Sequence, residues 1–186
     1  MELSDLQELF EQAHKLTKHR EFVVVGSLSI LGIVQGRQVP ARMLMSIDVD
    51  CFTLRDPGRI FELRGELGEG SPFELAHGYY LDPTSPDLPT LPAGWESRLV
   101  QVPLGERIVA YFLDPNDAAV SKYARNEPRD REWIRAGLEA ALLSAPIIES
   151  RFRQTVFFDV QESERARKAL AEDRGRWIAG RAPATR

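Results

Sequence analysis

The stretch "MSIDVDCF" (residues 45–52) places Asp48 and Asp50 inside an otherwise apolar run. If this run is a β-strand, side chains two positions apart lie on the same face, roughly 6–7 Å from each other. Two carboxylates at that separation repel by roughly 2–3 kcal/mol at an effective dielectric constant near 20. The strand therefore needs either a compensating cation or a face that is open to water.

The residues beyond the pair favour a compensating cation. Phe52 and Leu54 follow on the face of the aspartates, and a fully hydrated face would not become apolar there. Charge next to an apolar surface is typical of functional sites. The opposite face, with Ile47 and Val49, is expected to be buried.

A second stretch, "VVVGSLSI" (23–30), completes the hypothesis. It predicts a buried strand that ends at Gly26 and turns at Ser27 directly into a helix. Free amides at such a turn favour a phosphate group. If the two strands are neighbours, both carboxylates face this turn, where they suit a Mg²⁺ ion that also holds substrate phosphates.

Hydrophobic periodicity and turn residues predict a mixed α/β (α+β) fold with a helical C-terminal cluster. Helices are expected at 4–19, 27–36, 56–67, 116–125 and 129–143, followed by two more; strands are expected at 21–26, 43–54, 76–82, 95–104 and 106–113, the last two as a hairpin that turns at Gly105. Ser4 with Gln7 predicts the capping box of the first helix. Residues 1–113 are expected to form an α/β core, 114–180 a helical part packed on it, and 181–186 a flexible tail.

Composition limits the function classes. The chain of 186 residues has a net charge of −4, and the basic residues after position 150 leave −8 on the first 150 residues. We therefore do not expect residues 1–150 to bind nucleic acid through bulk electrostatic attraction. No apolar run is long enough for a membrane span, no signal pattern begins the chain, and the lone Cys51 excludes an internal disulfide. We expect a cytoplasmic protein without a membrane partner.

Gly26-Ser27 followed by the Ser-X-Asp-X-Asp strand resembles the nucleotidyltransferase superfamily with the polymerase-β-like fold. The block "LDPNDAAVSKYARNEPRDREWIRAGL" (113–138) resembles the lysine- and aspartate-bearing motifs of its minimal, AbiEii-like members, among them an uncharacterised bacterial branch. The resemblance implies a small mixed sheet with flanking helices. It also implies a Mg²⁺-dependent enzyme that transfers NMP from an NTP to an acceptor, either tRNA, as a toxin with a cognate antitoxin, or a protein side chain.

The resemblance implies roles for matching positions only. Asp48 and Asp50 would hold Mg²⁺, and Gly26 and Ser27 would hold the β- and γ-phosphates of the nucleotide. Lys122 would contact the phosphate charge, with Arg125 beside it, and Asp130 would orient the helices or assist the acceptor. Arg37 or Arg42, in a loop that compact members lack, would also contact phosphate.

One departure leaves an alternative open. Many members carry a third carboxylate on a later strand, and the hairpin at 97–113 offers only Glu106, which is expected at its turn. The third ligand is therefore missing or comes from elsewhere. If it is missing, the chain is a catalytically inactive nucleotide-binding or protein-interaction module of the same fold; an unrelated α/β domain with a water-exposed edge strand is the remaining interpretation.

Overall fold

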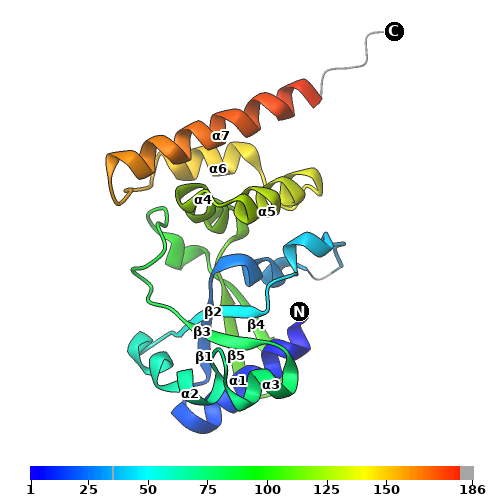
Figure 1. Ribbon diagram of the computed structural model, residues 1–186, viewed down its shortest axis with the longest axis vertical. Coiled ribbons are helices and arrows are strands. Elements are labelled where there is room, and N and C mark those ends of the chain that lie inside the picture. The colour runs from blue at the N-terminus through cyan, green and yellow to red at the C-terminus, as the bar shows by residue number, and fades with distance from the viewer. Residues whose placement is uncertain (35, 181–186) are drawn as a thin grey trace.

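A computed structural model describes residues 1–34 and 36–180, with side chains described up to residue 175 (Figure 1). The predicted tail at 181–186 lies outside the described residues. The strands are β1 (Glu21–Val24), β2 (Asp48–Thr53), β3 (Tyr80–Pro83), β4 (Val100–Leu104) and β5 (Ile108–Phe112). The α-helices are α1 (Leu3–Thr17), α2 (Arg64–Leu67), α3 (Pro72–His77), α4 (Pro115–Arg125), α5 (Pro128–Glu139), α6 (Ala145–Phe152) and α7 (Val160–Gly180), and the 3₁₀ helices are η1 (Gly26–Ile33), η2 (Ala41–Met43), η3 (Pro57–Leu63) and η4 (Trp95–Arg98).

The five strands form one mixed sheet in the order β3-β2-β1-β5-β4. β1 pairs parallel to β5 and antiparallel to β2, while β2 pairs parallel to β3 and β4 forms an antiparallel hairpin with β5. The central position of β1 follows from its sequence, because Phe22, Val23 and Val24 are all fully buried. The mixed α/β fold class with its helical C-terminal cluster is confirmed.

The α-helices lie at the two ends of the molecule, with the strands between them (Figure 1). α1, α2 and α3 gather at one end, and α4 to α7 stack at the other. η1 contacts β2, β4 and β5 on one side and α4 on the other, so it joins the sheet to the C-terminal helices. Among the described residues, no helix is both long and apolar enough to cross a membrane.

Several predicted elements differ in type or extent. The helix expected at 27–36 is the 3₁₀ helix η1, and the strand expected at 43–54 shortens to β2 because residues 41–43 form η2. Ile47, expected in the buried face, is 51% exposed, whereas Val49 is fully buried. The strand expected at 76–82 shortens to β3 because residues 76 and 77 end α3.

The termini of two helices show which capping residues the sequence specifies. In α1 the capping box uses Glu2 and Asp5 rather than the predicted Ser4 and Gln7, so the helix begins earlier than expected. In α4 the sequence Asp114-Pro115 gives the helix its start: the Asp114 side chain accepts a hydrogen bond from the backbone N–H of Asn116, and Pro115 is the first helical residue.

Candidate active site

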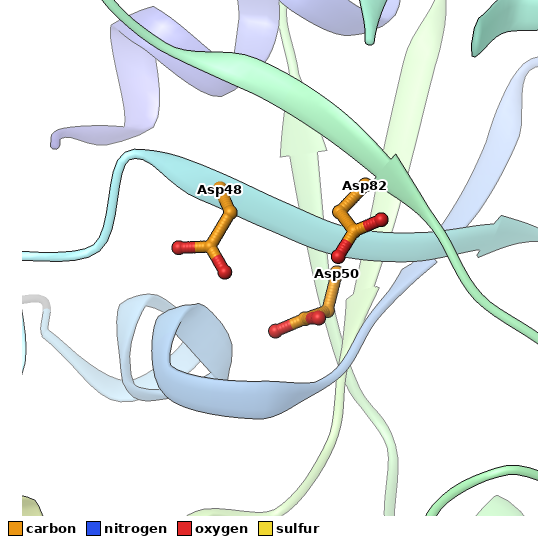
Figure 2. Close-up of side chains that lie close together, drawn as sticks. All are labelled: Asp48, Asp50 and Asp82. Atoms are coloured by element: carbon orange, nitrogen blue, oxygen red, sulfur yellow. The ribbon is translucent and has the colours of Figure 1, made fainter. Parts of the chain in front are cut away.

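Three aspartates from two neighbouring strands gather at one face of the sheet (Figure 2). Asp48 and Asp50 lie on β2, and Asp82 lies on β3 directly opposite Asp50 in the parallel register. One carboxylate oxygen from each lies within 4.8 Å of the others, and all three side chains are partly buried. The Ser46 hydroxyl donates a 2.5 Å hydrogen bond to Oδ1 of Asp48 and orients that carboxylate.

This donor set fits a hard divalent cation. All three groups offer oxygen, which Mg²⁺ prefers, and two ligands of one Mg²⁺ lie at most about 4.2 Å apart. Oxygens that already lie within 4.8 Å of one another reach a common ion through small side-chain rotations. The three residues therefore could hold a metal ion.

The electrostatics of the cluster disfavour full ionisation of its carboxylates when no cation is bound. Burial, together with the charges of Asp48 and Asp82, raises the pKa of Asp50 to about 7, despite the opposing effect of Lys122 and Arg125. Burial and the neighbouring Asp48 also raise the pKa of Asp82. Raised carboxylate pKa values are what a group of acids shows before a cation binds it.

The turn between β1 and η1 lies against this cluster. Gly26 has φ of +65°, and a Cβ at this position would overlap the carboxylate of Asp50. Only glycine combines this left-handed backbone with so close an approach. The predicted proximity of the Gly26 turn and the acidic pair is therefore confirmed.

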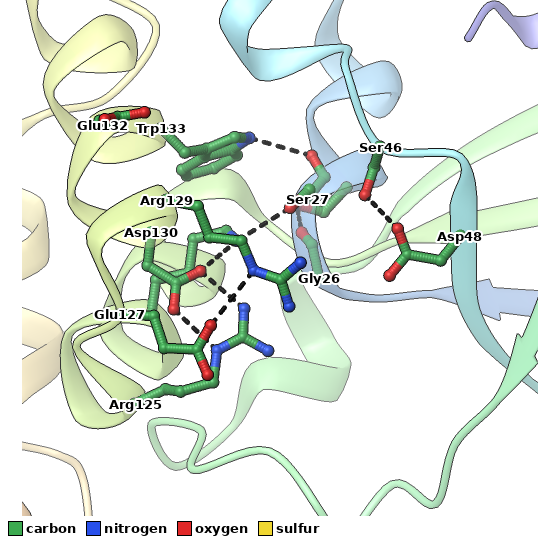
Figure 3. A network of polar contacts seen from close by, with 12 residues as sticks. Gly26, Ser27, Ser46, Asp48, Arg125, Glu127, Arg129, Asp130, Glu132 and Trp133 are labelled. Carbon is green, nitrogen blue, oxygen red and sulfur yellow. Dashed lines mark hydrogen bonds and ion pairs between the residues drawn. The ribbon is translucent and has the colours of Figure 1, made fainter.

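A second polar cluster lies on the other side of this turn (Figure 3). The buried Nζ of Lys122 donates to Oγ of Ser27 at 3.0 Å and to Oδ1 of Asp130 at 2.9 Å, and it lies 5.0 Å from the centroid of the Trp133 ring. Arg125 binds the same carboxylate through two nitrogens, at 2.7 and 2.6 Å. Two cations thus share one carboxylate, which leaves net positive charge opposite the acidic cluster.

The short connection between α4 and α5 builds this second cluster. Asn126, in the left-handed conformation, ends α4, and α5 begins at Pro128. The reversal brings the last turn of α4, with Lys122 and Arg125, against the first turn of α5, with Asp130. Each charge also suits the helix end on which it lies, because cations are favoured at C-termini and anions at N-termini.

Burial and charge act against each other in the buried pair. Burial lowers the pKa of Lys122, although the Asp130 carboxylate opposes this effect. Burial alone would raise the pKa of Asp130, but the hydrogen bonds and charges of Arg125 and Lys122 outweigh it and hold that pKa below its usual value. The carboxylate of Asp130 is thereby stabilised in its ionised form.

A cavity of about 480 Å³ is lined by at least one residue of each cluster. Gly26 and Asp50 line one part of it, and Lys122 and Arg125 line another. Further lining comes from α7 and from the proline-rich loop at 84–94, which lies between β3 and η4. A ligand in this cavity would meet a carboxylate cluster and a cation cluster at the same time, which is the combination that a metal-bound phosphate compound requires.

The structure brings most of the predicted site residues into the two clusters, and Gly26, Asp50, Lys122 and Arg125 also line the cavity. The two loop arginines are the exceptions. Arg42 lies on η2 and forms an ion pair with Glu132 of α5, Arg37 is exposed, and neither is among the described residues that line the cavity. Their predicted contact with phosphate gains no support from these positions. Glu106 lies exposed at the β4–β5 turn, as expected.

Sequence reasoning misses Asp82. It looks for the third carboxylate on the hairpin at 97–113, whereas this residue lies on β3, the strand that flanks β2 on its other side. A signal is present, because Asp82 follows the apolar run "YYL" at the end of a predicted strand. What the sequence does not reveal is that β3 pairs in parallel with β2 and so places this residue beside Asp50.

Comparison with known families agrees with this geometry. Neither the curated proteins nor the solved structures gave a match. A family model described as "Nucleotidyltransferase of unknown function (DUF6036)" matches residues 4–177, from α1 into α7. Because this match spans nearly the whole sequence, including both polar clusters, the chain belongs to this family of nucleotidyltransferases of unknown function.

Proposed function

We propose that the chain is a Mg²⁺-dependent enzyme that transfers the NMP group of a nucleoside triphosphate to a hydroxyl acceptor. The observation that carries this proposal is the group of Asp48, Asp50 and Asp82, whose oxygens lie close together and whose Asp50 lines a cavity together with Lys122 and Arg125. Membership in a nucleotidyltransferase family supports it.

In the proposed reaction, the acceptor oxygen forms a bond to the α-phosphorus, and the bond between this phosphorus and the oxygen of the leaving pyrophosphate breaks. The acceptor hydroxyl loses its proton. Bound Mg²⁺ would neutralise phosphate charge and orient the pyrophosphate. The protein's own contribution is positioning, because phosphoryl chemistry needs little else from side chains.

The Gly26–Ser27 turn would receive phosphate oxygens. The absence of a side chain at Gly26 lets the main chain and the Asp50 carboxylate lie side by side. Oγ of Ser27 accepts its hydrogen bond from Lys122, so the hydroxyl proton of Ser27 remains available for a phosphate oxygen.

Lys122 and Asp130 fit positioning roles better than direct contact with substrate. Among the described residues, the Lys122 ammonium already meets Ser27, Asp130 and the Trp133 ring, and only 4% of its side chain is exposed. Arg125 is the better direct phosphate ligand, because half of its side chain is exposed and its Nη1 has no partner among the described residues.

The catalytically inactive alternative loses its main argument. It depends on a missing third carboxylate, and Asp82 supplies a carboxylate at the required place. A nucleotide-binding module without catalysis remains the second hypothesis, and it differs from the first in one outcome: nucleotide binding without transfer.

The finer assignments come from the resemblance to AbiEii-like enzymes. We propose membership in that branch, a cytoplasmic location and a tRNA end as acceptor, which would make the protein a toxin with a cognate antitoxin. A protein side chain is the competing acceptor. Separate reactions with total tRNA and with a protein extract distinguish the two acceptors by where the label appears.

The test of the proposed function is transfer of label from each of the four α-phosphate-labelled NTPs in the presence of Mg²⁺. Wild type should label an acceptor, and Asp50→Asn should abolish the transfer. Asp87→Asn, which removes an exposed carboxylate from the proline-rich loop, is the matched control and should keep full activity. Equal labelling by Asp50→Asn and wild type would overturn the proposal.

A further inference from the structure

The cavity extends from the acidic cluster to the first turns of α7. Glu162 and Arg165 of this helix line it, together with Thr90 of the proline-rich loop. Residues three apart lie on the same face of a helix, so Glu162 and Arg165 both face the cavity. None of these positions belongs to the motifs that the sequence singles out.

The outer wall of the cavity is held in place by polar contacts between the loop and α7. Oγ1 of Thr90 donates to Glu162 at 2.9 Å, and the backbone N–H of Phe158 donates to the same carboxylate at 2.6 Å. Nearby, the backbone N–H of Ala93 donates to the carbonyl oxygen of Gln154 at 2.9 Å. Oε1 of Glu162 therefore ties the loop to α7, while its Oε2 accepts from the segment that leads into that helix.

Arg165 differs from the other arginines around this helix. Arg131 and Arg135 pair with the buried Asp173, and Arg174 pairs with Glu149. Among the described residues, Arg165 has neither an ion-pair partner nor a hydrogen-bond partner, although Glu162 lies one turn away. It is an exposed guanidinium at the rim of the cavity, without a protein partner among the described residues.

From this arrangement we propose that the part of the cavity between Arg125 and Arg165 is a polyphosphate subsite. This inference rests on the proposed function and names the part of the nucleotide that lies there. With the α-phosphate and the Mg²⁺ ion beside Asp50, the β- and γ-phosphates extend from the metal along the cavity towards α7. Arg125 meets them from α4 and Arg165 from α7.

Chemistry favours phosphate over the other parts of a nucleotide at this place. Guanidinium groups bind phosphate oxygens through paired, charge-assisted hydrogen bonds, and neither the ribose nor a neutral base supplies that charge. Two arginines on different helices can also follow a chain of phosphates, because each meets a different group. The nucleoside then lies outside this subsite.

The test measures binding by calorimetry, in the presence of Mg²⁺, of an NTP and of inorganic tripolyphosphate. Arg165→Gln should weaken the binding of both ligands about tenfold, the loss expected for one charge-assisted contact. Arg167→Gln is the matched control: it removes the same charge from the same helix, but Arg167 does not line the cavity and donates to Ser163. This control should bind both ligands as wild type does.

Each other outcome has a distinct meaning. If Arg165→Gln binds both ligands like wild type, or loses affinity for the NTP alone, the polyphosphate subsite is wrong while the proposed function stands. Equal losses in Arg165→Gln and Arg167→Gln would also overturn the subsite, because the effect would then reflect only overall charge. If wild type binds no NTP at all, both the subsite and the proposed function fail.

Discussion

Gly26 lies directly against the carboxylate of Asp50, with no space for even a methyl group between them. The contact joins the turn after β1 to the acidic cluster on β2, two segments that the chain separates by more than twenty residues. It places the predicted phosphate-binding turn and the predicted metal ligands at one site.

Replacing Gly26 with alanine should disturb both functions of this contact. The new Cβ collides with the Asp50 carboxylate, and the alanine must adopt the positive φ of the glycine that it replaces. We therefore expect a loss of about 1–3 kcal/mol in the free energy of unfolding. Urea denaturation measures this loss, and a Mn²⁺ titration should show weakened metal binding.

The control is Gly78→Ala, which also has a positive φ but has open space where the methyl group of the alanine would lie. It should lose about 1 kcal/mol from backbone strain and keep its affinity for metal. Unchanged metal affinity in Gly26→Ala would contradict the account of this contact.

Removing the third carboxylate should separate metal binding from stability. Asp82→Asn removes one of the charges that repel Asp50, so the metal-free protein should be at least as stable as wild type. The same variant should lose the rise in melting temperature that Mn²⁺ gives wild type, measured by differential scanning fluorimetry. Asp87→Asn should retain that rise; a full rise in Asp82→Asn would exclude Asp82 as a ligand.

The raised pKa of Asp50 predicts a pH dependence in the metal-free protein. Between the ordinary carboxylate pKa near 4 and the folded value of about 7, the folded state holds a proton that the unfolded state has lost. The contribution of Asp50 to stability is therefore largest at low pH and falls by up to about 1.4 kcal/mol per pH unit across this window.

Urea denaturation in a chelating buffer at pH 5, 6 and 7 checks this trend against Asp50→Asn. As pH rises from 5 to 7, wild type should lose free energy of unfolding relative to Asp50→Asn, because only wild type carries the titrating carboxyl group. A difference that stays constant with pH would show that the carboxyl group titrates normally.

The buried ion pair predicts a strong effect on folding. Asp130→Asn leaves Lys122 buried without its counterion, and breaking one side of such a pair costs roughly 3–5 kcal/mol. Arg129→Gln, which breaks an exposed pair with Glu127 at the start of the same helix, should cost less than about 1 kcal/mol. Chemical denaturation of both variants gives the comparison, and equal losses would refute the structural importance of the buried pair.

Local sequence signals predict the elements that depend on local chemistry. The Asp114 cap, followed by proline, determines the start of α4, and the apolar run at 22–25 determines the central strand. Leu16 shows the limit of periodicity: the spacing of apolar residues places it on the buried face of α1, but it is 50% exposed. Thr17 is buried instead, and its hydroxyl donates to the carbonyl oxygen of Ala13.

The composition of the candidate site could not be predicted fully from local sequence, because it depends on contacts between segments far apart in the chain. The pairing of β3 with β2 brings Asp82 to Asp50, and such non-local pairing leaves no periodic trace in the sequence. The position of Arg165 depends in the same way on how α7 packs against α4. The division into a core at 1–113 and a helical part at 114–180 stays a prediction, which limited proteolysis near residue 113 would test.

The most direct test of the metal site is anomalous diffraction from crystals grown with Mn²⁺ and a non-hydrolysable NTP analogue. The account predicts an anomalous peak within coordination distance of the carboxylates of Asp48, Asp50 and Asp82, in contact with the phosphates of the analogue. A bound analogue whose phosphates and metal lie away from these three residues would contradict it.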